Sequence, residues 1–262
     1  MLRRNILLVG DLHVGSEWGI FPKDFVTEGG NKIVLNAQQE ELLTLWNRMQ
    51  EDLCGIYDTV FLMGDIVNGL SKKSFGKHQI ISDLNEQDKA AIQLLEPICK
   101  GKQTIGISGS GYHMSADYEI DKHICEMLNG RFVGLVRNIK IKGSDISINI
   151  AHGGGSAPVY LGTKMTREIL QSLMSTALKK VPDVQIICRA HHHTYAYMNL
   201  AGRHFVLNPC WEGARLDVYS SPHYFRFQPD IGVTLITIHG DEISVKPFLY
   251  ELKHETQSMM EI

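Results

Sequence analysis

Five short segments of the chain place metal-binding or phosphate-facing side chains directly after an apolar run. The segments are Asp11-Leu12-His13, Gly64-Asp65-Ile66-Val67-Asn68, Gly111-Tyr112-His113, Ala151-His152-Gly153 and Ala190-His191-His192-His193. A mixed set of carboxylate, amide and imidazole ligands suits Mn²⁺, Fe or Zn²⁺ better than Ca²⁺ or Mg²⁺ alone. Two such ions about 4 Å apart can activate water and clamp a phosphoryl oxygen. The residue types therefore indicate phosphate-ester chemistry at a metal centre.

The apolar runs before these segments are predicted to be short buried strands, because β-branched residues are frequent in them. They cover residues 6–9, 60–63, 104–108, 146–150 and 184–188. In open α/β sheets, ligands bind beyond the carboxyl ends of the strands. Because the candidate residues follow five such ends, we expect them to form one site.

Each segment also has an ordinary structural explanation. Asp65 after Gly64 could cap the next element, and Asn68 could start a turn. The histidine run could be an exposed polar loop, although the apolar residues before it favour burial nearby. Strand alternation would place His191 and His193 on one side and His192 on the other. The combination of five segments favours a metal centre over these separate explanations.

Helices are expected in the first half where apolar residues recur at helical spacing, over residues 36–53, 85–100 and 115–128, with Asn36 as an N-cap. Alternation of these helices with the strands implies parallel strands joined by crossovers. The second half is expected to contain more strands. We predict a hairpin over 131–142 and 145–151, a helix over 164–179, and strand pairs over 195–200 with 204–207 and 231–238 with 242–249.

These elements predict two mixed sheets packed face to face, with helices on both outer surfaces. We expect a single domain over residues 1–262, with the motifs in 1–193, a β-rich completion of the second sheet in 194–250 and a polar tail in 251–262.

The composition fits a soluble globular protein, with 44% hydrophobic and 21% charged residues. A net charge of −3 gives no global attraction to nucleic acid or to an anionic membrane. No segment approaches the ~20 apolar residues of a membrane span, so no membrane partner is expected. Five cysteines without a CxxC pair fit a reducing compartment.

Taken together and in this order, the five segments resemble the motifs of the calcineurin-like metallophosphoesterase superfamily. They span residues 11–193 of the 262. The resemblance implies an α/β fold, a four-layer α/β/β/α sandwich of two mixed sheets flanked by helices. It also implies a dinuclear centre whose ligands can be assigned position by position.

The resemblance implies that the first ion is held by Asp11, His13, Asp65 and His193, and the second by Asp65 (bridging), His152 and His191. His113 would protonate the leaving oxygen or stabilise the transition state, a role suited to an imidazole near its pKa. His113 and Asp65 are thus the predicted catalytic residues. Mn²⁺ is the favoured ion at both positions, with Fe or Zn²⁺ as alternatives.

The third motif departs from the superfamily pattern, because Tyr112 stands where an asparagine ligand is expected. A neutral phenol is a poor substitute for an amide carbonyl. The second ion could therefore bind weakly, use a water in that place, or recruit another group such as Asn68. Tyr112 and Asn68 are accordingly candidate metal or phosphate contacts.

The second motif ends in Asn68-Gly69 and lacks the arginine with which Ser/Thr protein phosphatases grip a phosphomonoester. This difference favours diester substrates. Tyr112-His113, with the later Pro209-Cys210-Trp211, also resembles bacteriophage-encoded members of the superfamily. We therefore expect a cytoplasmic protein, either bacterial or phage-encoded and acting in the host cytoplasm.

The sequence thus predicts a metal-dependent phosphoesterase, in particular a phosphodiesterase or nuclease acting on DNA or nucleotide diesters. Lys72, Lys73 and Lys77 could contact backbone phosphates, or could lie in a solvated loop. The alternatives are a phosphomonoesterase acting on a phosphoprotein or metabolite, and a catalytically impaired metal-binding assembly protein. No oligomeric state is predicted.

Overall fold

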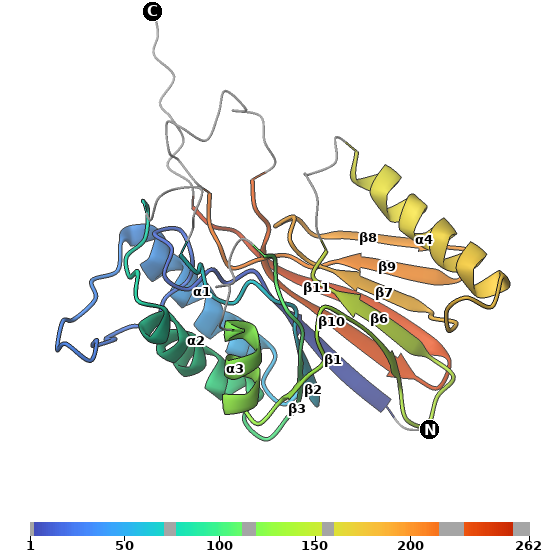
Figure 1. Ribbon diagram of the computed structural model, residues 1–262, viewed down its shortest axis with the longest axis horizontal. Helices are drawn as coiled ribbons and strands as arrows, with labels where there is room; N and C mark the ends of the chain where they lie inside the picture. The colour runs from blue at the N-terminus through green and yellow to red at the C-terminus, as the bar shows by residue number, and fades with distance from the viewer. Residues whose placement is uncertain (1–2, 71–76, 112–118, 154–159, 215–227, 254–262) are drawn as a thin grey trace, which may run out of the picture.

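The computed structural model describes residues 3–70, 77–111, 119–153, 160–214 and 228–253 (Figure 1). These residues form two mixed sheets. The first sheet has the order β11 (Glu242–Tyr250), β10 (Ile231–His239), β1 (Arg3–Val9), β2 (Thr59–Leu62), β3 (Gln103–Gly106) and β4 (Arg131–Phe132). The second has the order β5 (Val136–Lys140), β6 (Ser147–Ala151), β7 (Ile186–Arg189), β9 (Arg203–Leu207) and β8 (Ala196–Leu200).

Three helices join the parallel strands β1 to β4 and cover the outer face of the first sheet: α1 (Ala37–Asp52), α2 (Leu84–Cys99) and α3 (Ile120–Met127). The predicted N-cap of α1 is confirmed. The Asn36 side chain accepts the N–H of Gln39 over 2.9 Å, and Gln39 Oε1 accepts the N–H of Asn36 over 3.2 Å. This reciprocal pair fixes the start of the helix.

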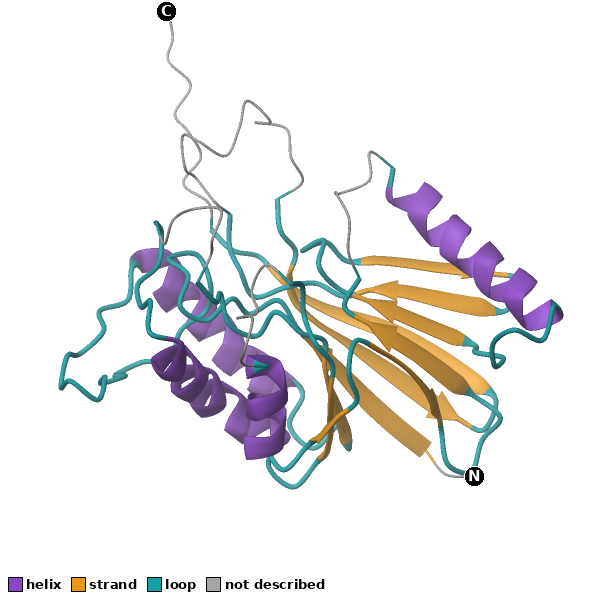
Figure 2. Ribbon diagram, in the orientation of Figure 1, coloured by secondary structure: helices purple, strands orange, loops and turns teal. Residues whose placement is uncertain are grey.

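The sandwich has four layers, as predicted, with helices outside the two facing sheets (Figure 2). The central strands therefore bury both of their faces. Along β1, Leu7 and Val9 pack against the helices, whereas Ile6 and Leu8 pack against the second sheet. Helix α4 (Leu161–Ala177) covers the outer face of the second sheet, and its Met165 and Ile169 are buried against that sheet. The fold is therefore the α/β/β/α sandwich.

Two predictions for the second half are wrong. Residues 131–142 do not form one hairpin strand: β4 pairs with β3 in the first sheet, and β5 pairs with β6 in the second. Gly134, with a φ of 86°, lies where the chain passes from one sheet to the other. Residues 194–250 also do not all complete the second sheet, because β10 pairs antiparallel with β1 and so extends the first.

The two hairpins predicted after residue 194 are confirmed. The β8–β9 hairpin turns at Ala201-Gly202, and the β10–β11 hairpin turns at Gly240-Asp241. The remaining predicted strands and helices are present at slightly shifted boundaries. Residues 115–118 of the third predicted helix and 254–262 of the predicted tail lie outside the described residues. None of the described helices has the length and hydrophobicity needed to span a bilayer.

Candidate metal centre

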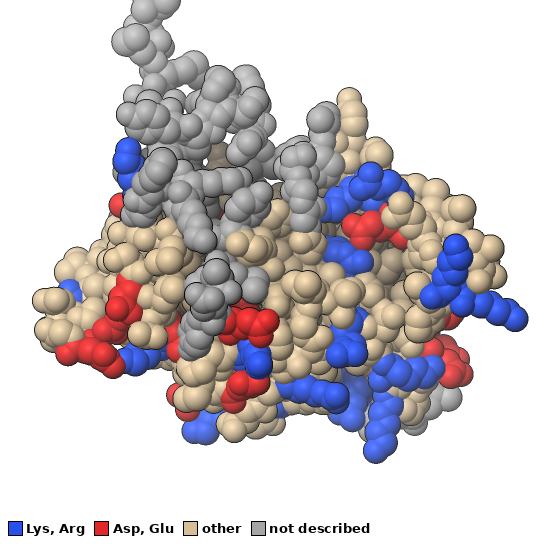
Figure 3. Space-filling model, viewed as in Figure 1, with Lys and Arg blue, Asp and Glu red and all other residues tan. Residues whose placement is uncertain are grey.

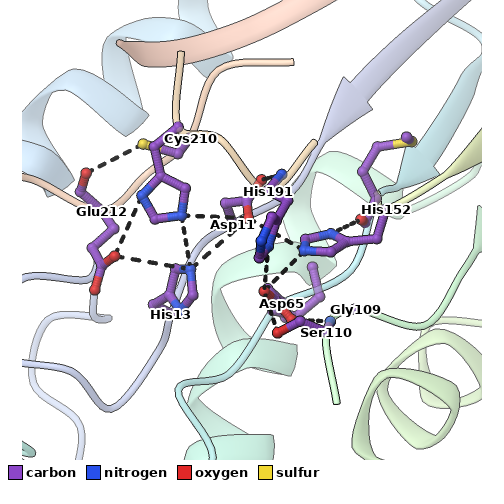
Figure 4. A network of polar contacts seen from close by, with 12 residues as sticks. Asp11, His13, Asp65, Gly109, Ser110, His152, His191, Cys210 and Glu212 are labelled. Carbon is purple, nitrogen blue, oxygen red and sulfur yellow. Dashed lines mark hydrogen bonds and ion pairs between the residues drawn. The ribbon is translucent and has the colours of Figure 1, made fainter. Parts of the chain in front are cut away.

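Six of the predicted residues converge where β1, β2, β6 and β7 end (Figure 4). They form two groups. The first cluster contains Asp11, His13 and His193, and the second contains Asp65, His152 and His191. Within each cluster, one ligand atom per residue lies within 4.8 Å of the others. Each cluster combines side chains from the ends of both sheets, so the site forms only when the two sheets pack together.

The backbone at the site adopts the left-handed conformation at five residues that are not glycine. These are Asp11, His13, Asp65, His191 and His193, with φ between 47° and 77°. Such conformations are strained and often lie at functional sites. Hydrogen bonds between the loops maintain them, because Asp11 donates its N–H to the Gly64 carbonyl over 3.0 Å and His13 donates to the Asp65 carbonyl over 3.2 Å.

The first cluster has a spacing that suits one ion. Asp11 Oδ1 lies 3.5 Å from His193 Nε2 and 3.9 Å from His13 Nε2. The two imidazole Nε2 atoms lie 3.1 Å apart. Ligand atoms about 2.0–2.2 Å from a metal ion lie roughly 3–3.6 Å from one another. Small side-chain shifts would therefore complete the coordination.

In the second cluster, His152 Nε2 lies 2.9 Å from Asp65 Oδ2, and His191 Nδ1 lies 4.0 Å from the same oxygen. The other ring nitrogen of His152, Nδ1, lies 2.7 Å from the Met63 carbonyl. A donated Nδ1–H would leave the Nε2 lone pair directed at an ion. Asp11 Oδ1 lies 3.8 Å from His152 Nε2, so the two clusters are adjacent. The bridging role of Asp65 stays a prediction.

Opposite charges inside the site shift the pKa values of its residues. Burial alone would raise the pKa of Asp11, but His152 and His193 outweigh it and lower the value. Burial would lower the pKa of His152, but Asp11 and Asp65 raise it to about 9. The pKa of His193 is also raised, because Cys210 and Asp11 outweigh burial. In the metal-free protein, protons on these imidazoles would balance the charge of the carboxylates, and a bound cation would replace them.

The burial of the clusters supports a cation in that place. Asp11, His13, Asp65 and His152 are at most 2% exposed. Within the described part of the chain, Asp11 Oδ1 makes no hydrogen bond of regular geometry, and His152 Nε2 has the ion pair with Asp65 at 2.9 Å. A buried carboxylate oxygen without a hydrogen bond is costly, and a metal ion would satisfy it. The residues present therefore fit divalent ions of the kind that carboxylate and imidazole bind together.

The other predicted site residues are not in these clusters. Tyr112 and His113 lie outside the described residues, so their roles stay predictions. Asn68 is buried and donates its backbone N–H to the Val14 carbonyl over 2.9 Å, and its contact to metal or phosphate also stays a prediction. His192 contacts Lys164 of α4.

Three buried residues beside the clusters were not found from the sequence. Glu212 Oε2 lies 3.4 Å from His193 Nδ1, and Cys210 donates its thiol to the Glu212 carbonyl over 3.2 Å. Asp121 of α3 accepts the N–H of Gly109 over 2.7 Å. Glu212 and Cys210 follow the carboxyl end of β9. The expectation that ligands bind beyond the carboxyl ends of strands could therefore have identified them. Asp121 carries no such signal, because acidic residues are common on helices.

No family model and no curated protein matches the chain. Several solved structures are similar to it over most of both chains. Vps29 from Entamoeba histolytica, complexed with Zn²⁺, is 16% identical with a TM-score of 0.45, covering 95% of this chain and 99% of its own. A predicted phosphoesterase from Streptococcus pneumoniae is 12% identical with a TM-score of 0.39, covering 95% and 99%. An archaeal phosphodiesterase is 11% identical with a TM-score of 0.46, covering 94% and 99%.

At these identities and TM-scores, the likenesses assign no activity or substrate to this chain. The particular resemblance to bacteriophage-encoded members stays a prediction. The α/β/β/α sandwich, with two carboxylate–imidazole clusters at the ends of its strands, confirms the predicted resemblance to the calcineurin-like metallophosphoesterase superfamily.

Proposed function

We propose that the protein is a metal-dependent phosphoesterase, in particular a phosphodiesterase that acts on DNA or nucleotide diesters through a dinuclear centre. The adjacency of the two clusters supports this proposal. Asp11 Oδ1, in the first cluster, lies 3.8 Å from His152 Nε2 in the second. Two divalent ions held there would polarise a phosphoryl oxygen and lower the pKa of an attacking water. Mn²⁺ is the proposed ion.

The residues of the site would have different roles in the reaction. The buried carboxylates of Asp11 and Asp65 would balance the charge of the ions. His191 and His193 have side chains that are 22% and 23% exposed, whereas the Asp11 and Asp65 side chains are 0% and 2% exposed. A substrate phosphate would therefore approach from the loop that follows β7. His113 is the group proposed to protonate the leaving oxygen.

The end of the second motif supports a diester substrate. Where the superfamily's protein phosphatases carry an arginine, this chain has Gly69, whose N–H is donated to Gln87 Oε1 over 2.9 Å. A phosphodiester carries one negative charge, whereas a monoester dianion carries two. A site without that arginine therefore suits the less charged substrate.

Lys and Arg side chains lie mostly over the second sheet and α4 in the view of Figure 3, and acidic side chains gather over the helices of the first sheet. Of the three lysines predicted to contact phosphate, Lys72 and Lys73 lie outside the described residues. A nucleic-acid substrate and a cytoplasmic setting remain parts of the proposal.

Hydrolysis of bis-p-nitrophenyl phosphate and of p-nitrophenyl phosphate by metal-stripped protein, with and without Mn²⁺, tests the proposal. We expect Mn²⁺-dependent turnover that favours the bis ester and falls at least about 100-fold in Asp65→Asn. Asp145→Asn is the control, because the Asp145 side chain is fully exposed. Preference for the monoester would support a phosphomonoesterase. Ion binding without turnover of either ester would support a metal-binding assembly protein.

A further inference from the structure

A carboxylate outside the five motifs lies beside the first cluster. Glu212, which follows β9, is 1% exposed. Its Oε2 lies 3.4 Å from His193 Nδ1 and 3.9 Å from His13 Nε2 (Figure 4). A buried charge in this position requires partners of opposite charge. The two imidazoles of the first cluster, and any cation that they hold, are such partners.

The two clusters support a histidine in the same way but with different groups. In the second cluster, Nδ1 of His152 faces the Met63 carbonyl at 2.7 Å, and Nε2 faces Asp65. In the first cluster, Nδ1 of His193 faces Glu212, and Nε2 faces Asp11 at 3.5 Å. A partner behind the ring fixes which nitrogen keeps its lone pair for the metal. The partner is a neutral carbonyl in one cluster and an anion in the other.

The structure also holds Glu212 in place. Its other oxygen, Oε1, accepts the hydroxyl proton of Ser16 over 3.2 Å. Ser16 lies three residues after His13 and donates its backbone N–H to the His13 carbonyl over 3.0 Å. On the far side, Gly213 donates its N–H to the Trp18 carbonyl over 2.9 Å. The loops after β1 and β9 thus support each other and fix the carboxylate behind the first cluster.

We propose that Glu212 is a positioning residue of the first metal site. It accepts the Nδ1–H of His193, so that Nε2 keeps its lone pair directed at the ion. A carboxylate behind an imidazole makes the ring a stronger ligand than a carbonyl does, and it also adds negative charge to that of Asp11. The first site therefore binds its ion more tightly than the second. This inference rests on the proposed metal centre and not on the hydrolytic activity.

Calorimetric titration of the metal-stripped full chain with Zn²⁺ tests this role in Glu212→Gln. We expect two sites of unequal affinity in the unmodified protein, and a loss of about 10- to 100-fold at the tighter one in the variant. The weaker site should be unchanged. Glu86→Gln is the matched control, because Glu86 is also buried and accepts a backbone N–H, from Glu28, but lies on α2 outside both clusters.

Long-range ¹H–¹⁵N spectra of the Zn²⁺-loaded protein provide a second readout that general loss of stability would not mimic. In the unmodified protein, His193 should bind Zn²⁺ through Nε2 and carry its proton on Nδ1. In Glu212→Leu, which leaves no acceptor behind the ring, we expect a mixture of Nε2 and Nδ1 ligation, whereas the amide carbonyl in Glu212→Gln should keep the proton on Nδ1. If the Glu212 variants do not fold, Ser16→Ala replaces them, with an expected severalfold loss at the tighter site because Oε1 loses the Ser16 hydroxyl.

Unchanged Zn²⁺ affinity at both sites in folded Glu212→Gln, or pure Nε2 ligation by His193 in folded Glu212→Leu, would overturn the positioning role. That result, together with Mn²⁺-dependent turnover in the unmodified protein, would leave the proposed function standing. A chain that binds no divalent ion at all would overturn both.

Discussion

Asp11 joins the two sheets at the site, because its Oδ2 accepts a hydrogen bond of 3.0 Å from the backbone N–H of His191. His191 lies in the loop after β7 of the second sheet, whereas Asp11 follows β1 of the first. The other carboxylate oxygen, Oδ1, lies 3.5 Å from His193 Nε2 and 3.8 Å from His152 Nε2. One carboxylate thus contacts both clusters and positions the loop that carries two of the histidines.

Replacement of this carboxylate should therefore affect both metal sites. In Asp11→Ala we expect the bound metal to fall from two ions per chain toward none, because the first cluster loses a ligand and the His191 loop loses its anchor. In His13→Ala we expect the loss of the first ion only. Elemental analysis after dialysis against Zn²⁺ measures both. A fully retained second ion in Asp11→Ala would show that the anchor is not needed.

Binding of the second ion should become tighter as the pH rises. Asp11 and Asp65 raise the pKa of His152 to about 9 in the metal-free protein, against the effect of burial. An ion at the second cluster must displace that proton, so its affinity should rise about tenfold per pH unit below pH 9 and then level off. Titrations at pH 6, 7 and 8 measure this slope. A constant affinity over that range would contradict proton displacement from His152.

The strands that lead to the site could be predicted because each is a short β-branched run that a polar segment ends. That local pattern places Asp11, Asp65 and His191 at strand ends without any knowledge of strand order. Strand order itself depends on contacts far apart in the chain. Leu7 of β1 pairs with Leu235 of β10, and no local pattern indicates which sheet the β10–β11 hairpin joins.

The short elements and the supporting residues could not be predicted for a different reason. The strand β4 has two residues, too few to show a period of two, so it merged with β5 in the sequence pattern. Asp121 has a role only because the fold places the loops after β2 and β3 beside α3. Side chains that position a site through its backbone carry little sequence signal of their own.

We expect Gly109 to tolerate no larger side chain, whereas Gly111 should tolerate one. A Cβ added to Gly109 would overlap Oδ1 and the backbone N of Asp65, whereas a Cβ on Gly111 would meet no described residue within 4 Å. We expect Gly109→Ala to lower the free energy of unfolding by about 1–3 kcal/mol and to weaken the second ion, because Asp65 must move. Gly111→Ala should stay within about 0.5 kcal/mol of the unmodified protein. Urea unfolding and Zn²⁺ titration compare the two, and equal effects would contradict the steric explanation.

Asp121 should make the metal-free protein less stable as the pH rises from 4 to 6. Burial, with repulsion from Asp65, raises its pKa to about 6, above the value of about 3.9 in an unfolded chain. Between these values the folded state binds more protons than the unfolded state, so ionisation of this carboxyl lowers the free energy of unfolding by about 2 kcal/mol between pH 4 and pH 6.

Asp121→Asn has no such proton to lose. Its stability at pH 4 should be lower by about 1–3 kcal/mol, because one of the two N–H groups from Ile66 and Gly109 loses its acceptor. Urea unfolding at pH 4, 5 and 6 should then show a smaller decrease in the variant, and identical decreases would mean that Asp121 ionises as readily in the folded state as in the unfolded one.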